Sequence, residues 1–82
     1  MNYVYIVECS DGTYYTGWTN NLEKRIEMHS KGTGAKYTRG RGPVKLVYYE
    51  EFNDKKEAMK REYIIKKLTR DKKEELIKQC GI

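Results

Sequence analysis

The sequence contains few of the residues that cross-link or interrupt small folds. Its 82 residues include only two cysteines, Cys9 and Cys80, and a single proline. Two thiols are too few for a disulfide scaffold and for a zinc site closed by four thiolates. We therefore expect two ordinary thiols in the reducing environment of the cytoplasm.

Long apolar runs are also missing. No stretch approaches the roughly 20 consecutive apolar residues that a membrane helix needs, and no signal-peptide pattern opens the chain. The sequence contains no internal repeat, low-complexity tract or linker. A chain of this length supports one hydrophobic core. We expect a single domain over residues 1–82 without membrane association.

Positive charge is in excess and is unevenly distributed. The formal net charge is +5, and residues 24–45 hold seven Lys or Arg against one acidic residue. Residues 54–82 hold ten Lys or Arg against six acidic residues. Clustered positive charge favours a phosphate-rich partner such as nucleic acid. A surface that merely keeps the protein in solution is the alternative.

Three segments have the pattern of β-strands. Residues 3–9 alternate in polarity and are rich in β-branched and aromatic types, as are residues 13–19. Between them lies Ser10-Asp11-Gly12, a turn signal. Residues 44–52 form the third predicted strand.

Each of three further segments begins with a residue type that caps helix N-termini. The first predicted helix runs from Asn20, with Glu23 as its capping-box partner, to about Ser30. The second runs from Asp54, with Glu57 as its partner, to about Leu68. The third covers residues 70–79 after Thr69, with Leu76 and Ile77 as its anchors. The order β-β-α-β-α-α predicts an α+β fold, a small three-stranded antiparallel sheet flanked by helices.

The turn between the first two strands decides which side chains share a face. With a two-residue loop, Tyr5 and Tyr15 lie on opposite faces. With a three-residue loop that has Gly12 at positive φ, Tyr5 faces Gly17 and Val7 faces Tyr15. We prefer the second register, because that loop demands a glycine at its third position. It places two phenols side by side, with the space left by Gly17 next to one of them.

Two predicted helices carry polar residues on faces that should be apolar. On the first, Arg25 and His29 share a stripe with two aliphatic residues at helical spacing. The alternative is that Arg25 snorkels to the surface and that His29 complements the helix dipole. On the second, Glu62 falls among apolar residues and must be hydrogen-bonded, paired or bound to a metal ion. Its alternative is a structural ion pair with Arg25 or Lys24.

The segment over residues 30–43 combines glycines with cations and one aromatic residue. Glycine lets backbone amides approach phosphates, cations neutralise them, and an aromatic ring can stack on a base. The residues in question are Lys31, Lys36, Tyr37, Arg39 and Arg41. We expect this loop to bind nucleic acid, and a flexible basic loop is the alternative.

The ordered set of these residues resembles the GIY-YIG nuclease domain. The set consists of Tyr3-Val4-Tyr5, Tyr15-Thr16-Gly17, Arg25, His29 one helical turn later, and Glu62. The resemblance covers about residues 2–80. The Gly-Ala-Lys-Tyr-Thr stretch at 34–38 is similar to the subset that includes structure-selective junction nucleases. The chain looks most like the short, stand-alone bacterial proteins of the uncharacterised YhbQ-like group.

This resemblance implies roles for individual residues. Glu62 would hold one divalent cation, Mg²⁺ or Mn²⁺, and Arg25 would stabilise the charge that develops on the phosphodiester. Tyr5 would orient or deprotonate the attacking water, with a nearby cation to lower its pKa. His29 would relay or accept a proton, and Tyr15 would hold a phosphate or water by its hydroxyl.

The remaining predicted contacts are with nucleic acid. Gly17 would leave room for the strand, and Lys36, Tyr37, Arg39 and Arg41 would grip its backbone. We expect a metal-dependent endonuclease acting on DNA rather than RNA, in DNA repair or recombination. The alternative is a nucleic-acid-binding module whose site is idle or depends on an unidentified protein partner. It is motivated by Tyr3 standing where the family has glycine, and by the lack of a late asparagine and of a second DNA-binding domain.

Overall fold

The computed structural model describes residues 1–34 and 38–81, and it contains three strands and three helices within them. The elements are β1 (Asn2–Glu8), β2 (Tyr14–Thr19), α1 (Leu22–Ser30), β3 (Lys45–Phe52), α2 (Lys55–Lys66) and α3 (Arg70–Cys80). The predicted order β-β-α-β-α-α is confirmed. No helix in the described ranges has the length and apolar character needed to cross a membrane.

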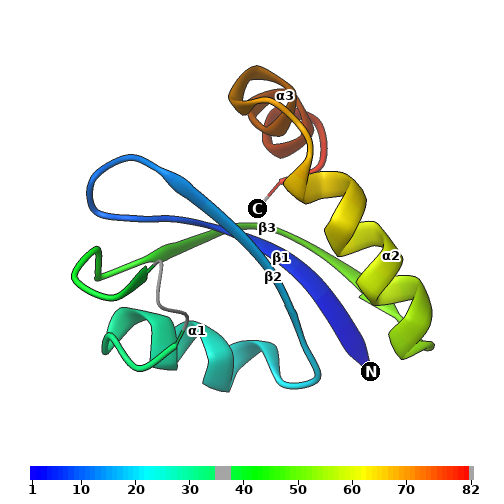
Figure 1. Ribbon diagram of the computed structural model, residues 1–82, viewed down its shortest axis with the longest axis horizontal. Coiled ribbons are helices and arrows are strands. Elements are labelled where there is room, and N and C mark those ends of the chain that lie inside the picture. The colour runs from blue at the N-terminus through cyan, green and yellow to red at the C-terminus, as the bar shows by residue number, and fades with distance from the viewer. Residues whose placement is uncertain (35–37, 82) are drawn as a thin grey trace.

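The three strands form one antiparallel sheet in the order β2-β1-β3. Helix α1 lies against one face of this sheet, and α2 and α3 lie against the other (Figure 1). Because β1 is the central strand, its side chains are covered from both sides, and four consecutive residues of it are buried. The predicted α+β class is therefore confirmed.

The hairpin between β1 and β2 has the preferred three-residue loop. Gly12 adopts a φ of +84°, and the amides of Gly12 and Cys9 bond across the turn to Cys9 and Thr13 carbonyls. Tyr5 consequently pairs with Gly17, and Val7 with Tyr15. The predicted register is confirmed, and it puts both phenols on the sheet face that α1 covers.

The hydrophobic core lies on the opposite face. Val4 and Ile6 of β1 pack there against Ala58 and Ile65 of α2, and all four are fully buried. Leu76 and Ile77 of α3 pack against this cluster as partly buried residues, which confirms them as anchors of the last helix. The core therefore fixes α2, the helix that carries Glu62, against the sheet.

The helix boundaries agree with the capping signals except at two ends. The first helix is capped by Asn21, not by the predicted Asn20, because the Thr19 hydroxyl accepts from the Asn21 amide and the Asn21 side chain accepts from Lys24. Asp54 and Thr69 cap α2 and α3 as predicted. Helix α2 ends at Lys66 rather than near residue 68, because its last amides bond three residues back and tighten the turn.

Candidate active site

Tyr5 lies at the centre of a polar cluster between β1 and α1. Its side chain is fully buried, and its hydroxyl oxygen is 2.7 Å from Nε2 of His29. The Nε of Arg25 donates to the same oxygen at 3.5 Å. Tyr5 comes from the central strand, whereas Arg25 and His29 come from successive turns of α1. The fold thus brings three of the predicted site residues into direct contact.

His29 is completely buried in the last turn of α1. Its Nδ1 lies 2.8 Å from the hydroxyl oxygen of Thr38, which is also fully buried. Burial, followed by the positive charge of Arg25, lowers the pKa of His29 from 6.5 to about 4. The imidazole is therefore neutral at neutral pH, and the alternative of a charged His29 that complements the helix dipole is wrong.

Tyr15 and Gly17 complete the cluster from β2. The Tyr15 ring centroid is 5.2 Å from that of His29 and 6.5 Å from that of Tyr5. A Cβ atom placed on Gly17 would lie 2.5 Å from the Tyr5 hydroxyl oxygen and 3.2 Å from Cε2 of Tyr15. The space left by Gly17 is therefore filled by the Tyr5 phenol. A contact of Gly17 with nucleic acid stays a prediction.

The Tyr5 phenol keeps its proton at neutral pH. Burial is the main reason that its pKa rises to about 12, and the neighbouring Tyr15 and Glu62 add to the increase. The hydrogen bond and charge of Arg25 act in the opposite direction. The cation that we expected near Tyr5 is thus present, but burial outweighs its effect on the pKa.

Glu62 approaches the cluster from α2. Its side chain is 18% exposed, and its Oε2 lies 3.3 Å from Nζ of Lys66 one turn later. That Nζ is 5.9 Å from the centroid of the Tyr15 ring. The alternative of a structural ion pair between Glu62 and Arg25 or Lys24 is wrong, because within residues 1–34 and 38–81 Glu62 pairs with Lys66 instead. The helical spacing of four residues could have predicted this pair.

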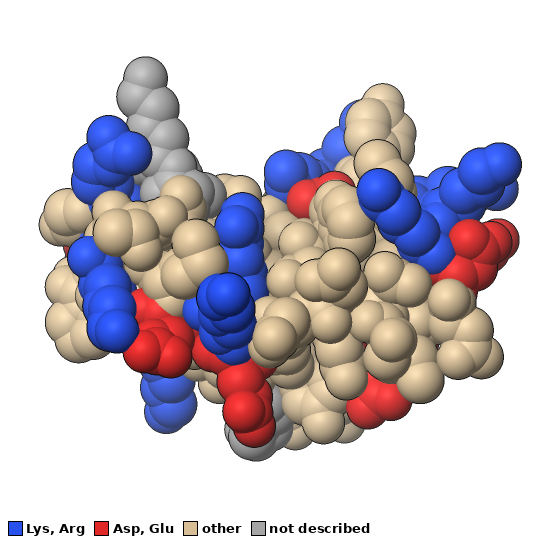
Figure 2. All heavy atoms as spheres, turned by 90° about the horizontal axis from the view of Figure 1, so that it is seen from below, with Lys and Arg blue, Asp and Glu red and all other residues tan. Residues whose placement is uncertain are grey.

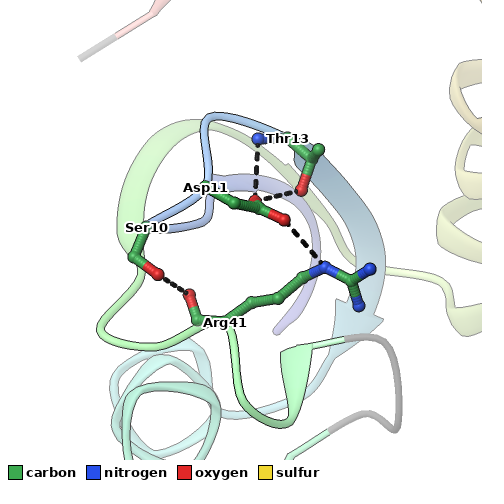
Figure 3. Close-up of polar contacts among 4 residues, drawn as sticks. All are labelled: Ser10, Asp11, Thr13 and Arg41. Carbon is green, nitrogen blue, oxygen red and sulfur yellow. Dashed lines mark hydrogen bonds and ion pairs between the residues drawn. The ribbon is translucent and has the colours of Figure 1, made fainter.

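The four loop residues predicted to grip nucleic acid separate into three groups. Lys36 and Tyr37 lie outside the described residues, and Arg39 is exposed. Arg41 contacts the hairpin turn instead, with its Nε 3.0 Å from Oδ2 of Asp11. Its backbone carbonyl accepts hydrogen bonds from the amide and the hydroxyl of Ser10 (Figure 3). Arg41 therefore fastens the loop to the β1–β2 hairpin.

The surface next to the cluster is polar and partly cationic. A hollow of about 200 Å³ is lined by Lys24 and Arg25 of α1 together with Thr19, Asn20, Asn21 and Met28. On one face of the molecule, Lys and Arg side chains lie on both sides with Asp and Glu side chains among them, and a largely uncharged area occupies part of the surface between them (Figure 2). Such a surface can attract phosphates, and Arg25 connects it to the buried phenol.

A metal ion would find one carboxylate here rather than a complete protein cage. Among the described residues, no group of three or more His, Cys, Asp or Glu side chains could hold a metal ion. Mg²⁺ and Mn²⁺ favour oxygen ligands, and Mg²⁺ commonly binds one or two carboxylates while keeping waters and substrate phosphates as its other ligands. Glu62 suits this kind of site, since its side chain is partly exposed and its charge acts on the Tyr5 phenol.

Thr38 is the residue of this cluster that sequence reasoning missed. It belongs to the Gly-Ala-Lys-Tyr-Thr stretch on which part of the resemblance rests, but that stretch indicates nucleic-acid contacts and not a partner for His29. Its complete burial in a segment otherwise predicted as an exposed basic loop becomes visible only in the structure.

The chain is similar in sequence to UPF0213 proteins. The chain is 67% identical over 82 residues to a UPF0213 protein of Clostridium perfringens, and the match covers 100% of this chain and 88% of that protein. It is 58% identical over 76 residues to a UPF0213 protein of Halobacterium salinarum, covering 93% of this chain and 99% of the relative.

Solved structures give the same result for the fold. The solution NMR structure of a UPF0213 protein from Bacillus halodurans matches with a TM-score of 0.65 and 55% identity over 99% of this chain and 87% of that one. An NMR structure of a protein from E. faecalis matches with a TM-score of 0.63 and 45% identity, over 95% of this chain and 83% of that one.

The family model described as the GIY-YIG catalytic domain matches residues 1–75. This match includes the two phenols, the guanidinium, the imidazole and the carboxylate of the site. The chain therefore belongs to the GIY-YIG family, whose nucleases act on nucleic acid.

Proposed function

We propose that this protein is a metal-dependent endonuclease that hydrolyses phosphodiester bonds in DNA during repair or recombination. The observation that carries the proposal is the buried Tyr5 hydroxyl, held between Nε2 of His29 at 2.7 Å and Nε of Arg25 at 3.5 Å. A permanent cation and a neutral imidazole on one phenol form a set that can move a proton while negative charge develops nearby.

Each residue of the cluster has a separate task in this reaction. Arg25 stabilises negative charge on the phosphodiester, and its guanidinium cannot lose its proton. As the attacking water bonds to phosphorus, its proton passes to the Tyr5 oxygen and the phenol proton passes to Nε2 of His29. The bond to the leaving oxygen breaks, and that oxygen takes a proton from bulk water. Tyr15 holds a phosphate oxygen or water by its hydroxyl.

Glu62 is the residue that would hold a divalent cation. Such an ion, Mg²⁺ or Mn²⁺, supplies Lewis-acid stabilisation of charge on the phosphate when it is bound. The Glu62 carboxylate is also one of the charges that raise the pKa of Tyr5. Neutralising this carboxylate therefore favours loss of the phenol proton. The carboxylate of Glu62 also pairs with Lys66 one helical turn later.

A nicking assay with matched variants tests the proposal. Supercoiled plasmid and a branched DNA junction are incubated with the protein and Mg²⁺, Mn²⁺ or a chelator, and a single-stranded RNA serves as the competing substrate class. We expect metal-dependent cleavage of DNA that falls about a hundredfold or more in Arg25→Ala and Glu62→Gln. Cleavage that persists unchanged in both variants would reject it.

The control variants make the same charge changes away from the cluster. Lys72 and Glu75 form an exposed pair on α3 at 3.8 Å, with side chains that are 67% and 62% exposed. Lys72→Ala and Glu75→Gln should retain wild-type cleavage. If the controls lose as much activity as the site variants, the loss reflects net charge and not the cluster.

A second candidate is a nucleic-acid-binding module without cleavage. It is favoured by the buried Tyr5 phenol, whose pKa of about 12 keeps it protonated, and by Tyr3 in the place of the family's glycine. It predicts salt-sensitive binding with no strand scission in either metal, unless an unidentified protein partner completes the site. Binding in the presence of metal and absence of product would support this candidate over the first.

A further inference from the structure

The hydrogen bonds around Tyr5 have a direction that is set at Arg25. A guanidinium carries only donors, so Nε of Arg25 donates and the Tyr5 oxygen accepts. In this series of hydrogen bonds, the first bond therefore runs from Arg25 to Tyr5, whether the imidazole is neutral or protonated.

The proton of the Tyr5 hydroxyl has one acceptor. Tyr5 is fully buried, and within residues 1–34 and 38–81 its hydroxyl contacts Arg25 and His29. If Nε2 of His29 also donated to this oxygen, the phenol proton would be buried without a partner, which native structures avoid. Tyr5 therefore donates to Nε2 across the 2.7 Å contact.

The tautomer of His29 follows from this direction. Burial keeps the imidazole neutral, and a neutral imidazole that accepts at Nε2 carries its proton on Nδ1. The atom 2.8 Å from Nδ1 is the hydroxyl oxygen of Thr38. The Nδ1–H group thus donates to Thr38, and the series of hydrogen bonds runs from Arg25 through Tyr5 and His29 to Thr38.

Backbone contacts hold Thr38 in this place. Its carbonyl accepts from the amide of Arg41 at 3.0 Å, and the Arg41 side chain is paired with Asp11 of the hairpin turn. On the imidazole itself, a Cβ atom on Gly34 would lie 2.5 Å from Nδ1 of His29. A glycine at that position therefore lets the backbone approach the same ring edge that Thr38 binds.

We propose that the hydrogen bonds from Arg25 through Tyr5 fix His29 as the Nδ1–H tautomer, and that Thr38 is the positioning residue that accepts the Nδ1 proton and so keeps the lone pair of Nε2 directed at the Tyr5 hydroxyl. In this tautomer the O–H bond of Tyr5 can break while an N–H bond forms at Nε2. The phenolate then accepts from Arg25, and the imidazolium keeps its Nδ1–H bond to Thr38. In the other tautomer Nε2 already carries a proton and cannot take a second. This catalytic meaning rests on the proposed nuclease function, whereas the tautomer does not.

The sequence makes the tautomer directly measurable, because His29 is the chain's one histidine. A long-range ¹H–¹⁵N correlation spectrum of uniformly ¹⁵N-labelled protein near neutral pH gives a single imidazole pattern. The unprotonated ring nitrogen resonates well downfield of the protonated one, so the pattern identifies the tautomer. We expect Nδ1–H in the wild type and in Thr38→Ser, and a shift to Nε2–H or a mixture in Thr38→Val.

Two further variants test the direction of these bonds. Tyr5→Phe removes the donor to Nε2 and should shift the pattern to Nε2–H or a mixture, because the Thr38 hydroxyl can donate to Nδ1 as well as accept from it. Thr16→Val removes a different buried threonine hydroxyl, which has no partner in the described part of the chain, and should leave the pattern unchanged. In the nicking assay Thr38→Val should lower kcat at least tenfold with little change in KM, and Thr38→Ser should restore it.

The outcomes separate the two proposals. An Nε2–H pattern in the wild type would overturn the tautomer assignment, an unchanged pattern in Thr38→Val would overturn the role of Thr38, and an unchanged Nδ1–H pattern in Tyr5→Phe would overturn the control by Arg25 and Tyr5. If Thr38→Val does not fold, the spectra of the wild type, Thr38→Ser and Tyr5→Phe still show whether His29 is the predicted tautomer. A Thr38-dependent Nδ1–H pattern in a protein that cleaves nothing with either metal supports the tautomer assignment and rejects the nuclease function.

Discussion

At the scale of single residues, His29 links the site to the stability of the fold. Its pKa of about 4 in the folded protein lies below the value of 6.5 for the free side chain. Between these values the unfolded chain binds a proton that the folded chain does not. The free energy of unfolding should therefore fall as the pH drops from 6.5 toward 4, by about 3 kcal/mol at most. Urea unfolding at a series of pH values checks this.

The control for this pH dependence is His29→Gln, which cannot be protonated. Its free energy of unfolding should change less than that of the wild type between pH 6.5 and 4, although it is less stable at neutral pH. Equal pH profiles for the two proteins would mean that the buried imidazole contributes nothing to acid unfolding.

Gly17 is the residue whose smallest change should disturb the phenols most. In Gly17→Ala the new methyl group would lie 2.5 Å from the Tyr5 hydroxyl oxygen, so the phenol must move. We expect a loss of stability of about 1–3 kcal/mol and at least a tenfold loss of any nuclease activity. Thermal unfolding and the nicking assay measure both effects.

The neighbouring Thr16 provides the matched control on the same strand. Its hydroxyl is buried and makes no hydrogen bond with the described residues. Replacing it with the similarly shaped Val removes an unsatisfied polar group, so Thr16→Val should change stability by less than about 1 kcal/mol or increase it. A larger loss in Thr16→Val than in Gly17→Ala would contradict this account of β2.

At the scale of elements, an ion pair connects α2 to the sheet. Nη2 of Arg61 lies 3.0 Å from Oε2 of Glu50 on β3, and the side chains are 34% and 23% exposed. The Tyr48 hydroxyl donates to the same carboxylate. Arg61→Met should destabilise the fold by about 1–2 kcal/mol, because it leaves a partly buried carboxylate without its cation.

Urea unfolding measures this loss against an exposed pair. Lys72→Met removes the partner of Glu75, whose side chain is 62% exposed, and should cost less than about 0.5 kcal/mol. Equal losses in Arg61→Met and Lys72→Met would show that the pair with Glu50 does not hold α2 in place.

The elements also show how far the sequence predicts this protein. The strands and their register follow from alternation and from Gly12, since one loop geometry needs a glycine there. That register and the helical period were enough to place Tyr5 near Arg25 and His29. The first cap was misplaced by one residue because two asparagines are adjacent and the Thr19 hydroxyl selects Asn21.

Other features of the site depend on tertiary contacts that no local pattern encodes. Thr38 reaches His29 from a segment without periodicity, so its burial could not be predicted. The high pKa of Tyr5 depends on how completely the fold excludes water from its hydroxyl. Arg41 is one of several basic residues in sequence, and only its contact with Asp11 distinguishes it from the exposed Arg39.

At the scale of the whole molecule, positive charge should govern encounters with DNA. The net charge is +5. When affinity comes from phosphate contacts, the logarithm of the binding constant falls linearly with the logarithm of the salt concentration. Arg39→Ala removes an exposed cation and should reduce the slope of log K against log salt by about one. Fluorescence anisotropy with a labelled duplex at several salt concentrations measures the slope.

Lys72→Ala, on α3, is the control of equal charge, and it should leave that slope unchanged. If both variants reduce it equally, the protein binds DNA through its overall charge and not through the segment that carries Arg39. A slope near zero in the wild type would exclude phosphate-driven binding altogether.

The close approach of Gly34 to the imidazole has a consequence for motion. With backbone on one edge and the Thr38 hydroxyl bound to the same nitrogen, the ring has no room to rotate about its bond to Cβ while both stay in place. Ring reorientation and displacement of these two residues must then occur together. Any ligand that shifts Gly34 or Thr38 would change the rate at which the ring reorients. The NMR signals of this buried histidine would therefore detect binding at the surface.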